Sequence, residues 1–313
     1  MIGAIALQIQ LARPDHWFKN VFMLPGAALA IVLSAHYAIW PDIGALLLGI
    51  IATCLLASAN YTINEWLDAE FDRFHPVKKQ RPAALGLATP MRVYAQWCLL
   101  SLIGLGLSAT LGWQFFLFAA LLLLMGIAYN VRPIRLKDRL YLDVLSESLN
   151  NPIRFMLGWS TVSTDIFPPS SILLAFWMGG AYLMTVKRYA EYRFIADPDV
   201  AASYRRSFRY YSEPNLLVSA FFYGLLAAFF LGVFLIKYRI EFIIALPFLA
   251  LLFAWYLNLG MRVDSIAQRP EALYKEWKFA IYVCFVGFLI SFLFFYDMPW
   301  LNVLVEHHVL STH

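Results

Sequence analysis

Three polar side chains recur at a fixed interval near the end of a long apolar segment. Asn64, Asp68 and Asp72 are four residues apart, so a helix that continues to about residue 73 places them on one face, one turn apart. Two carboxylates at this spacing suit a hard divalent cation. Mg²⁺ takes one or two carboxylates, keeps several waters and fills its other positions with substrate phosphates. The spacing therefore predicts a magnesium site here.

A run of basic residues follows this acidic face, in a loop that Pro76 and Pro82 stiffen. These side chains would neutralise a diphosphate held by the metal. The alternative interpretation is a solvated helix end, in which the acids pair with the loop cations. The basic residues are Arg73, His75, Lys78, Lys79 and Arg81.

A second polar face is predicted on the least hydrophobic apolar segment, residues 140–160. Asp143, Glu147 and Asn151 again stand four residues apart, and Arg154 follows about one turn further on. This face would hold metal or phosphate opposite the first. The alternative is a polar contact between helices in the core of the bundle, with Arg154 paired to Glu147.

Two further polar segments flank apolar runs. In VKRYAEYR, residues 186–193, the cations Lys187 and Arg188 suit a sugar phosphate donor that brings a 5-phosphate as well as a diphosphate, although membrane topology alone would also allow them. In RPDHWFKN, residues 13–20, Lys19 would sit near lipid phosphates, and the alternative is a simple interfacial anchor.

The composition sets the architecture that must position these residues. The chain has 313 residues, of which 61% are hydrophobic and 14% charged, and repeated apolar runs of about 20 residues are typical of a polytopic helical membrane protein. We predict an all-α fold with one transmembrane domain, residues 1–313, and about nine spans. The spans are 20–40, 43–65, 93–111, 113–131, 140–160, 170–188, 215–236, 241–259 and 278–296.

The distribution of basic residues predicts the orientation. The N-terminal segment and every second loop hold 21 of the 24 Lys and Arg residues, so this face is expected to be cytoplasmic and the C-terminus to lie on the far side. Topology explains these cations, and with them the RLKDR segment, residues 135–139. It does not explain acids within or beside a span, because acids contribute little to orientation and a charge at the centre of a spanning helix costs about 2.5–3.5 kcal/mol. The acids are therefore the informative residues.

Four minor features carry weaker expectations. Cys54, Cys98 and Cys284 lie in apolar runs without metal spacing and are interpreted as packing residues. The N-terminus lacks the basic segment of a cleavable signal peptide. Residues 204–215 resemble an amphipathic helix able to cover the site. The histidines near the C-terminus, expected to be an exposed tail, are His307, His308 and His313.

The motifs together resemble a known family. NEWLDAEFD is similar to the first aspartate-rich motif, NDxxDxxxD, of the UbiA superfamily of intramembrane prenyltransferases, with Glu65 in place of the usual Asp. The continuation DRFHPVKKQRPAALG is similar to the DRxHPxKxxRPxAxG extension of the decaprenyl-phosphate phosphoribosyltransferase branch. RPDHWFKN and VKRYAEYR resemble that branch's RPxxWxKN and KRYAE motifs. The resemblance spans roughly residues 13–220.

The resemblance implies a UbiA-like helical bundle with a cytoplasm-facing active-site cavity in a bacterial inner membrane. The implied reaction is Mg²⁺-dependent transfer of 5-phosphoribosyl from 5-phosphoribosyl 1-diphosphate to a polyprenyl phosphate, with release of diphosphate. The implied metal ligands and catalytic residues are Asn64, Asp68 and Asp72. The implied substrate-binding residues are Lys19, Arg73, His75, Lys78, Arg81, Asp143, Glu147, Asn151, Arg154, Lys187, Arg188, Tyr189 and Glu191.

Two other functions stay open at this point. A UbiA-type enzyme of a quinone or haem pathway would move a prenyl group from prenyl diphosphate to an aromatic acceptor through the same metal site. A transporter whose acids carry a cation predicts paired broken helices in two halves, and no such repeat is visible. A nucleic-acid partner is not expected, and a homo-oligomer is compatible with the sequence.

Overall fold

The structure is a computed structural model that describes residues 3–33, 42–164, 166–262, 265–268 and 270–304. Every regular element in these residues is an α-helix or a 3₁₀-helix, which confirms the all-α prediction. The three C-terminal histidines lie outside the described residues. The main helices are α1 (Ala4–Ala12), α2 (Met23–Leu33), α3 (Ile43–Asp72), α4 (Pro90–Thr110), α5 (Trp113–Asn130), α6 (Leu142–Ser148), α7 (Asn150–Ser160), α8 (Ser170–Ile195), α9 (Pro198–Tyr204), α10 (Glu213–Tyr238), α11 (Leu246–Gly260) and α12 (Trp277–Phe295).

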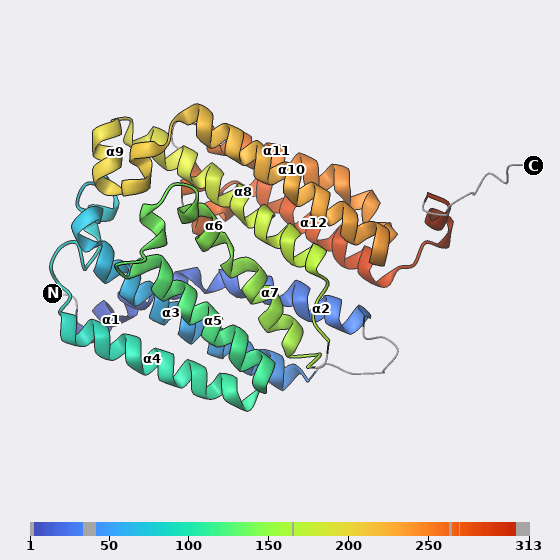
Figure 1. Cartoon of the computed structure of the whole chain (residues 1–313), viewed down its shortest axis with the longest axis horizontal. Coiled ribbons are helices and arrows are strands. Elements are labelled where there is room, and N and C mark those ends of the chain that lie inside the picture. The colour runs from blue at the N-terminus through green and yellow to red at the C-terminus, as the bar shows by residue number, and fades with distance from the viewer. Residues whose placement is uncertain (1–2, 34–41, 165, 263–264, 269, 305–313) are drawn as a thin grey trace, which may run out of the picture.

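The long helices run roughly side by side along the long axis of the molecule (Figure 1). Within the described residues, six segments are long and apolar enough to cross a membrane. The other three predicted spans coincide with α6 and α7 together, with α8, and with α12, whose apolar part is shorter. The six segments are Ile5–Leu33, α3, α4, α5, α10 and Ile240–Gly260.

Short 3₁₀-helices connect the long elements. One of them, η1, turns the chain between α1 and α2, and others lie in the loops that join long helices at the end of the bundle near α9 (Figure 1). This end therefore collects the polar connections. The 3₁₀-helices are η1 (Pro14–Phe22), η2 (Lys78–Gln80), η3 (Leu136–Asp138), η4 (Arg206–Tyr210), η5 (Ile240–Ala245), η6 (Ile266–Gln268), η7 (Pro270–Lys275) and η8 (Pro299–Leu304).

Helix α3 carries the first predicted polar face without interruption. Asp42 caps its N-terminus, because the Asp42 carboxylate accepts a hydrogen bond from the Ala45 amide at 3.2 Å, and the helix runs from Ile43 to Asp72. Pro76 follows four residues later, where a proline cannot continue the helical ladder. The expected extension of the second span beyond the apolar run is therefore present.

The fifth predicted span is two helices and not one. Helix α6 ends at Ser148, Leu149 forms a turn, and α7 starts at Asn150. Pro152 lies in the first turn of α7, where it has no N–H to donate to the Ser148 carbonyl. The break changes which residues of the second polar face can point the same way.

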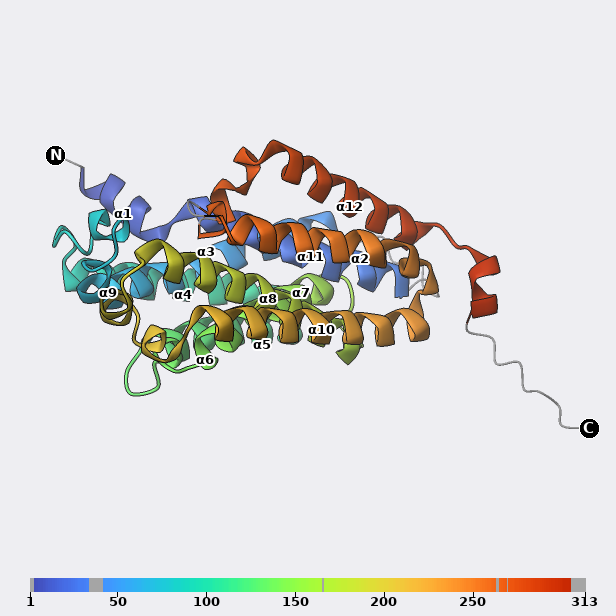
Figure 2. The ribbon, with the colours of Figure 1, turned by 90° about the horizontal axis from the view of Figure 1, so that it is seen from above.

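Close helix contacts hold the bundle around this break. Gly26 of α2 and Gly158 of α7 each face backbone of the other helix, and a Cβ atom on Gly158 would stand 1.8 Å from the Met23 carbonyl oxygen. Small residues permit such approach in membrane bundles, where packing replaces much of the hydrophobic driving force. Figure 2 shows α12 at one edge of the bundle, beyond α11.

The cysteines form no disulfide in the described chain. Cys54 is buried and accepts a hydrogen bond from Asn20, as expected for a packing residue. Cys98 and Cys284 instead lie exposed on α4 and α12, where a membrane-facing side chain has no protein neighbours to pack against.

Candidate active site

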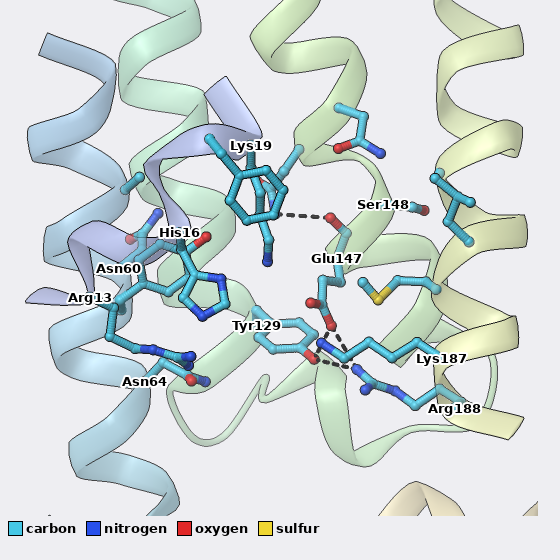
Figure 3. Close-up of a pocket in the computed structure, with 18 of the residues that line it drawn as sticks. Arg13, His16, Lys19, Asn60, Asn64, Tyr129, Glu147, Ser148, Lys187 and Arg188 are labelled. Atoms are coloured by element: carbon cyan, nitrogen blue, oxygen red, sulfur yellow. Dashed lines mark hydrogen bonds and ion pairs between the residues drawn. The ribbon is translucent and has the colours of Figure 1, made fainter. Parts of the chain in front are cut away.

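A cavity of about 550 Å³ opens between the helices, and polar side chains of η1, α3, α5, α6, α7 and α8 line it (Figure 3). Its lining is strongly cationic, because eight Lys and Arg side chains face three carboxylates. Eleven of the sequence-predicted site residues lie on this lining. They are Lys19, Asn64, Asp68, Asp72, Lys78, Arg81, Glu147, Asn151, Arg154, Lys187 and Arg188.

The three polar residues of α3 reach the cavity from one side of the helix. The Asn64 amide donates a hydrogen bond to the Asp68 carboxylate at 3.2 Å. The same carboxylate accepts from Arg135 at 2.9 Å and forms an ion pair with Lys137. Asp68 is therefore held by two cations of the loop between α5 and α6.

Asp72 has its own cation. Its carboxylate accepts a hydrogen bond from Arg81 at 2.8 Å, and its side chain is 3% exposed. Glu65, the residue that departs from the family motif, is buried and lies outside the cavity lining. One of its carboxylate oxygens has no hydrogen-bond partner in the described part of the chain.

The donor atoms of α3 fit a magnesium ion. Asp68 and Asp72 present carboxylate oxygens to one cavity, and Asn64 presents an amide beside them. Among the described residues, no group of three or more His, Cys, Asp and Glu side chains could enclose a metal by itself. A cation held here would therefore take one or two carboxylates from α3 and further oxygens from water or a ligand, as Mg²⁺ commonly does.

Glu147 forms the acidic part of the opposite wall. Its carboxylate accepts hydrogen bonds from Arg188 at 2.6 Å and from the Tyr129 hydroxyl at 2.9 Å, as Figure 3 shows. Arg188 also donates to Asp143 at 3.3 Å and to Glu191 at 3.2 Å. One buried guanidinium therefore joins three carboxylates behind the wall.

Arg154 does not pair with Glu147, contrary to the alternative considered for the second polar face. Its Nε donates to the Asn20 side chain at 2.8 Å, and a second nitrogen lies 3.4 Å from the Asn150 carbonyl oxygen. Lys19 and Lys187 also line the cavity, and no carboxylate of the described residues lies within 4 Å of either ammonium group. These three cations face the cavity without neutralising carboxylates.

Five predicted site residues lie off the cavity lining. Arg73 is exposed. Asp143 is fully buried and accepts hydrogen bonds from Ser207 at 3.1 Å and from Tyr211 at 2.8 Å. The other three are buried, and Glu191 forms an ion pair with Lys78. These others are His75, Tyr189 and Glu191.

The pKa values around Lys78 follow from burial. Burial lowers the pKa of His75 and of Lys78, although Glu191 opposes both shifts. Burial and the neighbouring Glu191 carboxylate raise the pKa of Tyr204, which donates to Glu191 at 2.9 Å. Nearby, burial lowers the pKa of Lys137 to about 8, against the effect of Asp68. The loops thus pack their cations in a poorly solvated layer beside the cavity.

Several site residues were not singled out from the sequence. Arg13, His16, Tyr129 and Arg205 line the cavity, and the RLKDR segment supplies Arg135 and Lys137 to Asp68. Charge density was the one available signal, because RLKDR and YRRSFR are unusually basic, but positive-inside bias gives the same signal. Tertiary contacts separate the two explanations.

Part of the cavity is apolar. Helices α11 and α12 and the segment before α12 line it with bulky side chains, and Phe22 of η1 lies on the same lining. A ligand with a charged head and a hydrocarbon tail would find both kinds of surface in this one space. The apolar residues of this wall are Leu252, Phe253, Tyr256, Leu273, Phe279 and Val283.

Known proteins resemble this chain in sequence and in fold. Residues 23–277 match the UbiA prenyltransferase family. The chain is 34% identical over 187 residues to a decaprenyl-phosphate phosphoribosyltransferase of Mycolicibacterium smegmatis, covering 58% of this chain and 56% of that protein. It is 28% identical over 187 residues to a bacteriochlorophyll synthase 34 kDa chain of Chloroflexus aurantiacus, covering 59% of each. The matches thus span less than two thirds of these relatives' lengths.

The fold is shared more completely than the sequence. A UbiA homolog from Archaeoglobus fulgidus, solved with GPP and Mg²⁺, superposes with a TM-score of 0.68 at 20% identity. The superposition covers 91% of this chain and 99% of that one. The helical arrangement expected from the three sequence motifs is therefore confirmed.

Proposed function

This chain belongs to the UbiA prenyltransferase family, and from that premise we propose that it transfers 5-phosphoribosyl from 5-phosphoribosyl 1-diphosphate to a polyprenyl phosphate. The observation that carries the proposal is the charge of the cavity, in which eight cations surround two α3 carboxylates and Glu147. A donor with a diphosphate and a further phosphate, together with an anionic acceptor, would match this excess. Similarity to decaprenyl-phosphate phosphoribosyltransferases of several species supports the same choice.

The diphosphate of the donor would lie beside α3. Asp68 and Asp72, with Asn64, would hold Mg²⁺, which when bound would stabilise negative charge on the leaving diphosphate. Lys78 and Arg81 lie on the same lining and would pair with its oxygens. Arg73 is exposed, so its proposed contact with substrate would require the loop to move.

The opposite wall would orient the ribose and the acceptor. Lys187, Arg188 and Arg154 would bind the remaining phosphates, and Glu147 and Asn151 would face the sugar between them. Four predicted substrate-binding residues are buried and would act from behind the lining: Asp143, His75, Tyr189 and Glu191. Asp143 holds Tyr211, Glu191 holds Lys78, and Tyr189 accepts a hydrogen bond from Arg193.

The reaction needs no general base in this arrangement. The bond between the anomeric carbon and the diphosphate oxygen breaks, the diphosphate leaves with the electron pair, and an oxygen of the lipid phosphate forms the new bond to that carbon. The acceptor oxygen is already anionic. Preorganised cations that face the developing charge supply the electrostatic stabilisation. The apolar wall of α11 and α12 would hold the polyprenyl tail.

A second function is an aromatic prenyltransferase. The bacteriochlorophyll synthase relative and the GPP-bound structural neighbour favour it, because a prenyl diphosphate would use the same metal site and the same apolar wall. With this second function, Lys19, Arg154 and Lys187 would have no phosphate to bind beyond the two of the prenyl diphosphate.

We place the cavity mouth on the cytoplasmic face of a bacterial inner membrane, with the C-terminus opposite. The basic loops support this orientation, because α9 and the loops after α3 and α5 lie at one end of the bundle (Figure 1). A homo-oligomer remains compatible with the exposed apolar helices.

A transfer assay tests the proposal. Purified protein in lipid nanodiscs receives Mg²⁺, radiolabelled 5-phosphoribosyl 1-diphosphate and a polyprenyl phosphate, and the products are extracted into organic solvent. Label in the lipid phase, lost with chelator and in Asp68→Asn, supports the reaction and the metal site. Absence of lipid label from folded wild type, with transfer of labelled prenyl diphosphate to an aromatic acceptor, overturns it in favour of the second function.

A further inference from the structure

His16 is a buried imidazole in the cavity wall that the proposed chemistry does not yet use. Its side chain is 5% exposed, it lines the cavity, and Figure 3 shows its ring directed into the space between Lys19, Tyr129 and Asn64. Neither ring nitrogen has a hydrogen-bond partner in the described residues. From this we infer that His16 binds the sugar of the donor by a hydrogen bond to a ribose hydroxyl group, an inference that rests on the proposed function.

The ring is held in place by its neighbours while its nitrogens stay available. It lies 5.1 Å from the Tyr61 ring and 6.5 Å from the Phe18 ring, measured between centroids. Its Nε2 stands 3.5 Å from the Asp15 carboxylate, which is largely exposed. Buried polar groups are nearly always hydrogen-bonded, so two ring nitrogens that form no hydrogen bond with the described residues indicate a partner from outside them in this polar cavity.

The chemistry of the ring selects a hydroxyl group over a phosphate. A neutral imidazole offers one N–H donor and one acceptor nitrogen, which matches a hydroxyl group that both donates and accepts. Phosphate oxygens only accept, and the cations Arg13, Lys19 and Lys187 on the same lining suit them better. A prenyl diphosphate has no hydroxyl group, so this contact would be specific to a sugar donor.

The local fold places a phosphate ligand beside the sugar ligand. His16 and Lys19 both belong to η1 and are three residues apart, and side chains at this spacing lie on the same side of a 3₁₀-helix. Both line the cavity. One turn of η1 would therefore contact a phosphate through Lys19 and a neighbouring hydroxyl through His16.

The test compares His16→Phe with His16→Asn in the nanodisc transfer assay. Phenylalanine keeps the ring between Tyr61 and Phe18 but removes both nitrogens, and asparagine restores a donor and an acceptor. We expect kcat/KM for 5-phosphoribosyl 1-diphosphate to fall about tenfold or more in the Phe variant, with partial recovery in the Asn variant. The KM for the polyprenyl phosphate should not change.

Deoxy donors identify the contact. A donor lacking the contacted 2- or 3-hydroxyl should lower kcat/KM of wild type but cause no further loss in His16→Phe, because the interaction is already gone. Equal kcat/KM of folded wild type and Phe variant, or an additive loss with both deoxy donors, overturns the inference. If wild type transfers no phosphoribosyl group at all, the proposed function fails first, and the two failures are thereby distinguished.

Discussion

Arg81 donates a hydrogen bond to the Asp72 carboxylate at 2.8 Å, and this pair joins the loop after α3 to the predicted metal face. The carboxylate is almost fully buried, so the guanidinium is its main source of charge compensation. The same two residues line the cavity. Arg81 therefore holds a metal ligand and also faces the space that a diphosphate would occupy.

The first prediction concerns this pair. Arg81→Lys keeps the charge but loses the planar fork, and we expect kcat/KM for the donor to fall about tenfold or more. Arg81→Met should lower kcat/KM further, since it also leaves the Asp72 carboxylate without the neighbouring positive charge of Arg81. Initial rates of lipid labelling against donor concentration check both variants. Arg92→Met, which changes an exposed arginine of α4, is the matched control and should retain wild-type rates.

The α3 carboxylates give the second prediction. Asp68→Asn and Asp72→Asn should each lower Mg²⁺-dependent transfer about 100-fold or more, because each removes charge from the metal site. Glu65→Gln and Glu70→Gln should keep most activity, since Glu65 lies off the cavity and Glu70 is exposed. A Mg²⁺ titration of all four variants checks the assignment. Loss of activity in Glu65→Gln with normal folding would place that residue in the metal site after all.

The sequence anticipated α3 better than the segment that faces it. The four-residue spacing of Asn64, Asp68 and Asp72 was sufficient, because an uninterrupted helix turns equal spacing into one face. The same reasoning treated residues 140–160 as one helix, but the chain breaks at Leu149. Glu147 and Asn151 line the cavity, whereas Asp143 points toward Ser207 and Tyr211.

The partners of Asp68 could not be predicted from local sequence. Arg135 and Lys137 lie about 70 residues away and reach Asp68 only because the loop after α5 folds back onto α3. Their charge was equally consistent with the positive-inside rule. His16 was missed for another reason, since a single histidine in an interfacial segment carries no periodic signal.

The third prediction separates stability from catalysis in two adjacent residues. Arg188→Met leaves the buried Asp143 and Glu191 without that guanidinium, and we expect a loss of about 3–5 kcal/mol in the free energy of unfolding. Lys187→Met removes a cation that no carboxylate of the described residues binds within 4 Å. It should keep the melting temperature and raise the KM for a phosphate substrate. Thermal melting in detergent beside the transfer assay checks both.

The fourth prediction is a pH dependence at His75. Its Nδ1 accepts hydrogen bonds from the amides of Val77 at 3.1 Å and Lys78 at 3.2 Å, a role that only an unprotonated nitrogen can fill. Burial keeps its pKa below the ordinary 6.5 in the folded protein, with Lys78 acting in the same direction. Glu191 of α8 and Asp72 of α3 act against it, and Tyr204 of α9 packs on its ring.

The direction in which stability changes with pH follows from proton binding to His75. Between the folded pKa and 6.5 the unfolded chain binds the proton and the folded chain does not, so stability falls as the pH drops below about 6.5. Melting temperatures of wild type and His75→Asn, measured from about pH 7.5 to about pH 5.5, isolate this contribution. We expect the difference in melting temperature between wild type and His75→Asn to shrink toward low pH. A constant difference would show that His75 does not titrate in this window.

The fifth prediction concerns the contact that sets the distance between α2 and α7. A Cβ atom on Gly158 would stand 1.8 Å from the Met23 carbonyl oxygen, and this neighbour is backbone, which cannot rotate away. Gly158→Ala should therefore separate the helices and lower the free energy of unfolding by about 1–3 kcal/mol. Gly106→Ala in α4 is the matched control, because nothing lies within 4 Å of its added Cβ, and its higher helix propensity should leave the melting temperature unchanged or raised. Equal melting temperatures for the two variants would mean that α2 and α7 are not packed as closely as described.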